Sequence, residues 1–453
     1  MVLEGKNIVL VVADTLSAFH LPFHGHERET APFLSGLSEE YTYVEYGYAN
    51  APWTVPAHAS MFSGELPRDH GTTSRSMRFT EDSFVEELSR EGCFTLGVST
   101  NSLLNDTLGF DRGFDSYVSS KEGVVFRNRG WDALEQARDS DAEGLEKYLE
   151  FGKKALRERS PRSFVRGLKY FFSGSKFGGP DSLFEDFGAK DANGLVLDEL
   201  EGKDDFFAFV NYMEVHSPWV PPREFADKYV DDYESAVEVP LEMDFWSETF
   251  QEGVDEEKVD VCRDLYDASI RYLDSCIEEL YNSVMEKDGD TVFIITSDHG
   301  ELIGDYGWWN HQFGIWEKLL RVPIIIAGDG VPDTVIEENV SLRELHDLIL
   351  GEKEIDELGS DRVFAEYHGA EAFILDFSDR SRDEFPGEAG PFLENESRCV
   401  IEGRKGLIRN SEFPDFTFEA GEKGFSEEDA GLELPDLEAL LDREFGPVSG
   451  IDV

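Results

Sequence analysis

Side chains that can bind a divalent metal follow two apolar runs of the sequence. Asp14 comes directly after the run Asn7–Ala13. Asp298 and His299 come just after the run Thr291–Thr296. Carboxylate oxygens and an imidazole nitrogen are ligands that suit Mn²⁺, Mg²⁺, Ca²⁺ or Zn²⁺. Alone, each Asp would more often be a turn or helix-cap residue, so the metal interpretation depends on the two runs ending at the same place.

Thr54, in the stretch Ala51–Gly64, is the candidate nucleophile. A proline and several small residues follow it, and small residues allow a helix to begin close to a sheet with its N–H groups aimed at an anion. A threonine hydroxyl is a poor nucleophile at its own pKa, so it needs a metal or a base to lower the cost of forming the alkoxide. We therefore expect the Thr54 oxygen to complete the metal site.

The elements that would position these residues form a helix-flanked, mostly parallel sheet. Apolar β-branched runs are typical of buried parallel strands, and ligands in such sheets gather beyond the carboxyl ends of the strands. The predicted strands are Asn7–Ala13, Phe94–Ser99, Phe206–Tyr212, Thr291–Thr296 and Val322–Ala327, and the predicted helices are Phe84–Arg90, Val261–Met285 and Leu342–Leu350. The order predicts an α/β fold.

The composition limits the partners and the environment. The chain of 453 residues has 96 acidic and 41 basic residues, which gives a net charge of −55 and disfavours nucleic acid as a partner. Because 40% of the residues are hydrophobic, the chain can still build a core. A carboxylate-coated surface suits concentrated salt, where screening weakens self-repulsion, so we expect a halophilic, haloarchaeal source.

Cysteine usage and the absence of export signals predict a cytoplasmic protein. Four cysteines lie far apart without a C-x-x-C pair, which indicates free thiols in a reducing compartment. The first predicted strand begins without a signal-like n-region and h-region, and no run of about 18 apolar residues is present. The oligomeric state stays open.

The chain divides into two predicted parts. Residues 1–375 form the catalytic domain, with an insertion at about residues 120–200. Residues 376–453 form a small α+β subdomain and an acidic tail, with a hairpin at Cys399–Arg409. Within the insertion, Lys153–Lys176 is basic and interleaved with aromatic residues. This segment is a helix that pairs with the acidic body, a lid over an anionic substrate, or a peripheral membrane contact.

The motifs around the candidate residues resemble those of the sulfatase family within the alkaline phosphatase superfamily. They stand in the family order over roughly residues 6–330. They are Asp14, Ala51–Gly64, His216-Ser217-Pro218-Trp219, Ser297-Asp298-His299-Gly300-Glu301 and Leu320-Arg321-Val322-Pro323. The resemblance implies an alkaline phosphatase-like fold. It also implies one divalent metal held by Asp14, Thr54, Asp298 and His299, with a second metal left open.

The nucleophile departs from the family pattern. The family begins its C-x-P-S-R or S-x-P-S-R motif with the residue that becomes formylglycine, whereas this chain reads Thr54-Val55-Pro56-Ala57-His58. Oxidation of a threonine would give a ketone, not the aldehyde. Relatives in the superfamily that carry threonine here are nucleotide pyrophosphatases/phosphodiesterases, phosphopentomutases and phosphoglycerol transferases, and they imply a phospho-threonine intermediate.

The resulting hypothesis is hydrolysis or transfer of a phosphate or sulfate ester through a covalent Thr54 ester. The substrate would be a small-molecule, glycan-linked or lipid-linked anionic ester, and phosphate is favoured because the nucleophile is an unmodified threonine. One alternative is a sulfatase that acts without formylglycine. Another is a catalytically inactive sulfatase-like protein that binds an anionic glycan or lipid.

Further residues complete the predicted site. His216 matches a family histidine that contacts an ester oxygen, and His311 falls near the family's lysine or second-metal histidine. Either residue is expected to bind the transferring group or protonate the leaving oxygen. Weaker candidates for substrate binding are His58, Asn101 and Trp219, with a helix cap as the alternative for His58 and core packing for Trp219. His20, His24 and His26 are interpreted as surface or substrate-rim residues.

Overall fold

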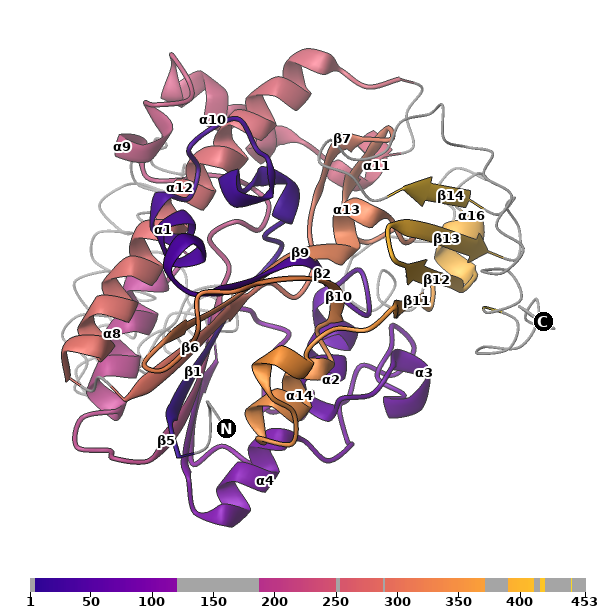
Figure 1. The fold of residues 1–453 in the computed structure, drawn as a ribbon. Coiled ribbons are helices and arrows are strands. Elements are labelled where there is room, and N and C mark those ends of the chain that lie inside the picture. Colours follow the sequence, from indigo (N-terminus) through magenta and orange to yellow (C-terminus); the bar gives the residue numbers. More distant parts are fainter. Residues whose placement is uncertain are drawn as a thin grey trace, which may run out of the picture.

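The computed structural model describes residues 5–119, 187–249, 253–287, 290–370, 390–410, 416–419 and 441. The predicted basic segment Lys153–Lys176 lies outside these residues, as does most of the predicted acidic tail. The described part forms an α/β body with a smaller antiparallel sheet beside it (Figure 1).

The central sheet has eight strands in the order β10-β2-β9-β6-β1-β5-β3-β4. The strands are β1 (Asn7–Ala13), β2 (Thr42–Tyr48), β3 (Phe94–Ser99), β4 (Ser116–Ser119), β5 (Phe206–Tyr212), β6 (Thr291–Thr296), β9 (Arg321–Gly328) and β10 (Val335–Ser341). β1 pairs in parallel with both β5 and β6, and all three strands are buried along their whole length. Burial on both faces explains why these strands are continuous apolar runs, and the predicted mostly parallel α/β sheet is confirmed.

The direction of β9 differs from the expectation. The predicted run Val322–Ala327 lies inside β9, but β9 pairs antiparallel with both β6 and β2. After β6 the chain stays at the carboxyl end of the sheet, where it forms the hairpin of β7 (Leu302–Asp305) and β8 (Trp308–Asn310) and the short helix α13 (Glu317–Leu320). β9 therefore begins at that end and runs back.

Helices cover both faces of the sheet (Figure 1). On one face lie α1 (Pro32–Glu40), α8 (Ala189–Glu199), α9 (Arg223–Ala226), α10 (Tyr233–Glu242) and α12 (Glu256–Lys287); on the other lie α2 (Thr54–Ser63), α4 (Phe84–Glu91) and α14 (Glu344–Ile349). Successive side chains of a strand point to opposite faces. Accordingly, Val9 and Val11 of β1 pack in one core cluster, whereas Leu10 and Val12 pack in the other. The three predicted helices correspond to α4, α12 and α14.

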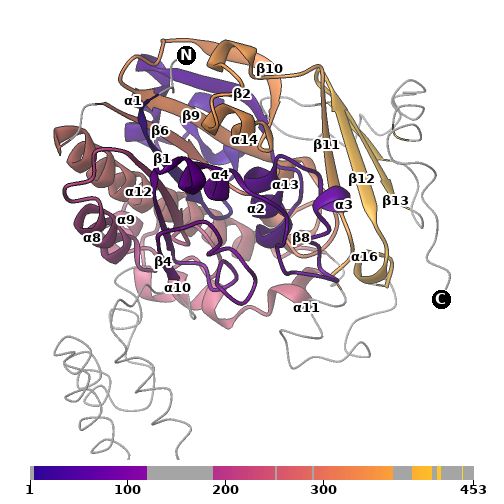
Figure 2. The same ribbon diagram turned by 90° about the horizontal axis from the view of Figure 1, so that it is seen from below.

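The second sheet packs against the carboxyl end of β2. It contains β11 (Arg362–Tyr367), β12 (Ser397–Glu402), β13 (Lys405–Asn410) and β14 (Phe416–Glu419), all antiparallel. Figure 2 shows this sheet beside the body, with α16 (Gly390–Glu394) at its end. The predicted hairpin at Cys399–Arg409 is β12–β13. Strand β11 begins before residue 376, the predicted start of the second domain. The remaining short elements are α3 (Pro67–His70), α11 (Phe245–Thr249), η1 (Ala18–His20), η2 (Pro22–His24) and η4 (Ile355–Glu357).

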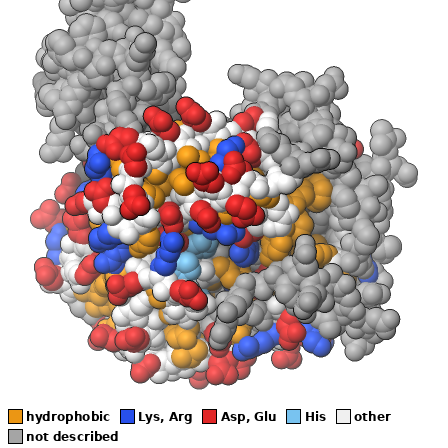
Figure 3. Space-filling view, turned by 90° about the horizontal axis from the view of Figure 1, so that it is seen from above, with side chains coloured by type: hydrophobic (Ala, Val, Ile, Leu, Met, Phe, Trp, Pro, Cys, Tyr) orange, Lys and Arg blue, Asp and Glu red, His pale blue; other side chains and the backbone are white. Residues whose placement is uncertain are grey.

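The surface of the described part is rich in acidic side chains. Figure 3 shows Asp and Glu spread over one face of the molecule, with Lys and Arg between them. All four cysteines are free, as the sequence predicts. Among the described helices, none is long and apolar enough to cross a membrane.

Candidate active site

The predicted metal ligands meet at the carboxyl ends of β1 and β6. Asp14, Asp298 and His299 each offer one ligand atom, and these atoms lie within 4.8 Å of one another. All three side chains are fully buried. Thr54 begins α2 at the same place, and its Oγ1 lies 3.5 Å from His299 Nε2. The fold therefore brings together the four residues that the sequence predicts as a metal site.

The two carboxylates each have one oxygen without a hydrogen bond among the described residues. Asp14 Oδ2 accepts a hydrogen bond from Asn101 Nδ2 (2.6 Å), and Asp14 Oδ1 has none. Asp298 Oδ1 accepts the N–H groups of Thr15 and His299, and Asp298 Oδ2 has none. Burial raises the pKa of both carboxyl groups, and the Asp14 charge raises that of Asp298 further. Orphaned, buried carboxylate oxygens side by side fit a divalent cation.

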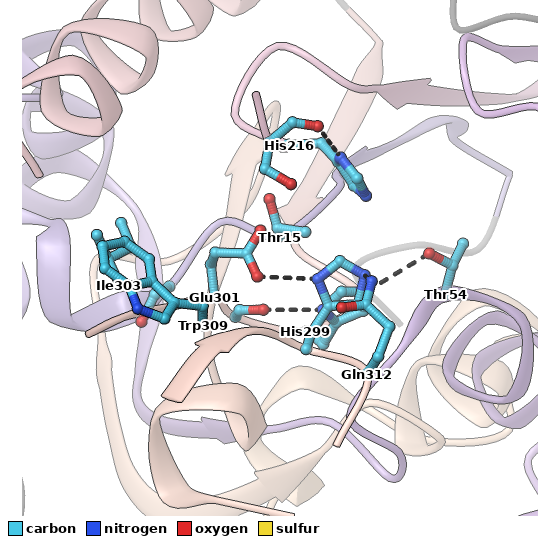
Figure 4. A network of polar contacts seen from close by, with 12 residues as sticks. Thr15, Thr54, His216, His299, Glu301, Ile303, Trp309 and Gln312 are labelled. Carbon is cyan, nitrogen blue, oxygen red and sulfur yellow. Dashed lines mark hydrogen bonds and ion pairs between the residues drawn. The ribbon is translucent and has the colours of Figure 1, made fainter. Parts of the chain in front are cut away.

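The orientation of His299 also fits a metal ligand. Its Nδ1 donates a hydrogen bond to the carbonyl of Gly300 (2.8 Å), which leaves a lone pair on Nε2 (Figure 4). Desolvation holds the pKa of His299 well below its usual range, so the ring is neutral. Nε2 lies 3.4 Å from Asp298 Oδ2. A lone pair and a carboxylate oxygen that face each other in this way fit a cation that both could bind.

Asn101 lies between the candidate metal ligand Asp14 and the candidate nucleophile Thr54. Its Nδ2 lies 2.6 Å from Asp14 Oδ2 and 3.5 Å from Thr54 Oγ1. Its Oδ1 accepts the N–H of Leu103, which fixes the direction of the amide. The predicted substrate-binding residue Asn101 therefore lies at the site, as a neighbour of both the candidate ligand Asp14 and the candidate nucleophile Thr54.

A cleft of about 280 Å³ opens in front of Thr54. Its lining residues are Trp53, Thr54, Ser74, Asn101, Ser102, Leu103, Met213, His216, Trp246, His311, Gln312, Tyr367, Gly369 and Ala370. His216 Nδ1 donates to the carbonyl of Ser217 (2.7 Å), so its Nε2 carries the free lone pair. The rings of His216 and His311 are 5.1 Å apart. Both predicted catalytic histidines thus line the cleft.

Glu301 is a partner of His311 that sequence reasoning missed. His311 Nδ1 lies 2.9 Å from Glu301 Oε1, and Gln312 Nε2 lies 3.1 Å from His311 Nε2 (Figure 4). Burial raises the pKa of Glu301 to about 8, and burial also lowers the pKa of His311. Both shifts favour the uncharged forms, so the buried pair holds its proton on Glu301 beside a neutral His311 ring. The signal in the sequence was the place of Glu301 at the end of the motif Ser297–Glu301.

His58 and Trp219 do not line the cleft, which corrects their predicted contact with the substrate. His58 is fully buried beneath the site, where its Nδ1 donates to the carbonyl of Thr54 (2.9 Å) and lies 3.5 Å from Asp298 Oδ2. Burial lowers the pKa of His58 to about 4. Trp219 is 0% exposed, and its Nε1 donates to the carbonyl of Val215 (3.0 Å). The orientation of His58 is explained by these contacts beneath the site, and the burial of Trp219 is explained by core packing.

The predicted surface histidines His20 and His24 are buried instead. His20 can be buried because Asp267 of α12 lies 2.7 Å from its Nδ1. The same carboxylate lies 3.1 Å from His26 Nε2. These three residues are also close enough to share a cation. However, Arg28 lies 3.0 Å from Asp267 Oδ2 and already supplies a positive charge there. The cluster is therefore satisfied by protein groups, in contrast to the site around Asp14.

One wall of the cleft contacts a partly buried ion-pair network at the end of the second sheet. Ser74 Oγ, in the cleft lining, donates to the carbonyl of His368 (3.0 Å). His368 Nε2 lies 3.1 Å from Glu366, and its Nδ1 lies 3.3 Å from Glu396. Burial opposes the charge on His368, but these two contacts outweigh it and raise the pKa to about 9.

Stability should therefore fall as the pH rises through about 9. Because the folded-state pKa of His368 exceeds the unfolded value near 6.5, its stabilising contribution is fully present below about pH 6.5 and is lost at higher pH. A shift of this size corresponds to about 3 kcal/mol at most. Denaturant unfolding at pH 6 and pH 9.5 should show this loss in the wild type and a much smaller one in H368Q. Equal losses in both proteins would refute the assignment, and H346Q serves as a control on α14.

The fold and the site define an alkaline phosphatase-like α/β protein. The phosphonate monoester hydrolase of Agrobacterium radiobacter superposes with a TM-score of 0.66 over 97% of this chain and 95% of that one, at 17% identity. An alkaline phosphatase superfamily protein from Vibrio parahaemolyticus gives a TM-score of 0.54, at 15% identity, over 97% of this chain and 84% of that one. The Sulfatase family pattern matches residues 6–351. The chain belongs to the sulfatase family.

Two relatives found by sequence similarity are named as sulfatases. The chain is 25% identical to a choline-sulfatase of Rhizobium meliloti over 346 residues, which cover 72% of this chain but only 63% of that protein. An arylsulfatase of Clostridium perfringens is 23% identical over 378 residues, 76% of this chain and 74% of that one. A shorter match, 35% over 68 residues, links 14% of the chain to 16% of the low-salt glycan biosynthesis sulfotransferase Agl7 of Haloferax volcanii.

Proposed function

We propose that the protein is a metal-dependent enzyme that hydrolyses or transfers phosphate or sulfate esters, with Thr54 as the nucleophile. The observation that carries the proposal is the convergence of Thr54 with the orphaned carboxylate oxygens of Asp14 and Asp298 and the free Nε2 of His299. The sulfatase and phosphonate monoester hydrolase names of its relatives support ester chemistry.

Asp14, Asp298 and His299 would hold the metal, together with the Thr54 oxygen. A divalent ion there supplies Lewis acidity, which lowers the pKa of a bound hydroxyl and neutralises charge on the transferring oxygens. Asn101 orients Asp14 through its amide, and Asp298 is oriented by two backbone N–H groups. Burial of all of these groups excludes bulk water from the metal side of Thr54.

The reaction would begin when Thr54 loses its proton to water in the cleft. Oγ1 then forms a bond to phosphorus or sulfur while the bond from that atom to the leaving oxygen breaks. The leaving oxygen takes the proton held by the pair Glu301 and His311, and His216 contacts the transferring oxygens. Water or an acceptor alcohol next attacks the phosphorus or sulfur atom, and the bond from that atom to Thr54 Oγ1 breaks. The attacking oxygen gives its proton to the pair Glu301 and His311, and Thr54 Oγ1 regains a proton from water in the cleft.

His311 should matter most for esters with a poor leaving group. A 4-nitrophenolate leaves without a proton, whereas an alkoxide needs one, so H311N should reduce kcat/KM for an alkyl ester by about 10²–10⁴-fold and change that for the 4-nitrophenyl ester little. Paired assays of the two esters on wild type and H311N provide the check. An equal fall for both esters would show that His311 does not protonate the leaving oxygen.

A panel of 4-nitrophenyl phosphate, phenylphosphonate and sulfate esters tests the proposed reaction. We expect turnover that disappears with a chelator and returns with an added divalent metal. We also expect a phosphorus ester to react faster than the sulfate ester, because an unmodified threonine lacks the formylglycine hydrate. Metal binding without turnover of any ester would favour a sulfatase-like binding protein, and faster sulfate turnover would favour a sulfatase without formylglycine.

We also propose that the protein works in concentrated salt. The net charge of −55 and the acidic surface support this environment, because screening at about 1 M salt shortens the Debye length to about 3 Å. The local similarity to a haloarchaeal protein agrees with it. The expected result is a free energy of unfolding that rises steeply with salt concentration.

A further inference from the structure

Thr15, the residue after Asp14, has a backbone conformation that branched side chains rarely adopt. Its φ is +66°, in the left-handed region, where a branched Cβ is crowded. Such strain persists only where surrounding contacts hold the residue in place. Because Thr15 is fully buried, those contacts come from the protein itself.

Three hydrogen bonds fix Thr15 and use every polar group it has. Its N–H donates to Asp298 Oδ1 (3.2 Å), beyond β6. Its hydroxyl donates to the carbonyl of Val215 (2.9 Å), beyond β5. Its carbonyl accepts the hydroxyl of Tyr266 on α12 (2.6 Å). Thr15 itself follows β1, so this one residue connects the carboxyl ends of three strands that carry the site.

Tyr266 is fixed by its own contacts, so its hydroxyl can hold the backbone of Thr15 in place. Its hydroxyl oxygen also accepts the N–H of Ser17 (2.9 Å), so the segment from Thr15 to Ser17 closes around one phenol group. The ring is fully buried, with edge contacts to His20 at 4.7 Å and to Trp219 at 5.9 Å. Figure 4 draws Thr15 in the middle of the site.

We infer that Tyr266 is a positioning residue of the active site. Its hydroxyl holds the backbone of Thr15 in the left-handed conformation. In that conformation the N–H of Thr15 points at Asp298, and Thr15 is bonded directly to Asp14. The relative placement of the two carboxylates therefore depends on a phenol that touches neither of them. This inference rests on the proposed function, in which Asp14 and Asp298 hold the metal.

A Thr15→Gly substitution distinguishes a positioning role of Tyr266 from a packing role. Glycine adopts positive φ without strain, so it should make the anchor unnecessary. Mn²⁺ affinity, measured by titration calorimetry, should fall about 10–100-fold in Y266F, the range for residues that orient metal ligands. T15G should stay within about threefold of the wild type, and Y266F/T15G should recover to within about threefold of T15G.

Two outcomes would overturn the inference. One is wild-type Mn²⁺ affinity in Y266F; the other is a double variant that binds as weakly as Y266F, since then Tyr266 acts through packing. If Y266F alone does not fold, the Mn²⁺ affinities of T15G and Y266F/T15G are compared instead. A difference above about tenfold between these two affinities would contradict the inference. Y212F is the matched control, because it removes a buried hydroxyl that bonds Asn193, away from the site, and it should bind normally.

Hydrogen exchange gives a readout that does not need a metal. The N–H groups of Thr15 and Ser17 should exchange at least about tenfold faster in Y266F than in the wild type or Y212F. Without the hydroxyl of Tyr266, the segment from Thr15 to Ser17 loses two hydrogen bonds and opens more often. Unchanged exchange would contradict the anchor even if the protein bound no metal. Failure of Mn²⁺ to bind the wild type would instead count against the proposed function.

Discussion

Replacement of Thr54 by alanine is expected to reduce ester turnover by about 10⁴-fold or more while the metal stays bound. The alanine removes the atom that forms the covalent ester, but it leaves Asp14, Asp298 and His299 in place. Loss of a nucleophile is among the largest single effects in enzymes with covalent intermediates. Steady-state assays with the best ester of the panel, together with metal analysis of the purified variant, measure both parts of the prediction.

Two companion variants sharpen the test of Thr54. T54S keeps a hydroxyl and should retain turnover well above that of T54A. S63A removes a hydroxyl at the far end of the same helix, where it donates to the carbonyl of Ala59 and accepts the N–H of Glu65, so the variant should behave like the wild type. Turnover by T54A within about tenfold of the wild type would assign the nucleophile elsewhere.

The Asp298→Asn variant should have opposite effects on metal affinity and on stability without metal. It removes one of two adjacent buried carboxylates, each of which has one oxygen without a hydrogen bond in the described structure. Mn²⁺ affinity should fall by about 100-fold or more, because the amide is a weaker ligand. In chelator, the free energy of unfolding should rise by about 1–3 kcal/mol, because an uncompensated buried charge is gone.

Asp274 provides the control for this prediction. It is also a buried Asp, but its carboxylate caps α1 by accepting the N–H groups of Phe33 and Leu34. D274N should therefore lose stability and keep its metal affinity. If D298N were destabilised in chelator to the same degree as D274N, the carboxylates of Asp14 and Asp298 would not form a cation site.

The main strands, and the meeting of Asp14, Asp298 and His299 at one place, could be predicted from the sequence because buried parallel strands leave a simple signal. β1 and β6 are apolar along their whole length and end in polar residues, so their carboxyl ends mark the site. Strands with mixed composition were missed. β10 places Glu337 and Glu338 at solvent, and β2 carries Glu45, so neither strand is a continuous apolar run.

The contacts within the site could not be predicted, because they join residues far apart in the chain. Nothing local indicates that Glu301 turns toward His311, or that Tyr266 of α12 reaches Thr15. The burial of Trp219 likewise depends on the neighbours that α11 and α12 provide. Side-chain direction at the end of a strand is set by tertiary packing, which the pattern of one strand does not contain.

The most direct test of a covalent Thr54 ester is rapid quenching of the enzyme during turnover, followed by peptide mass spectrometry. The expected result is one added phosphoryl or sulfuryl group on Thr54 in the peptide that spans the start of α2, present in the wild type and absent from T54A. An adduct on another residue, or the same adduct in T54A, would contradict Thr54 as the nucleophile.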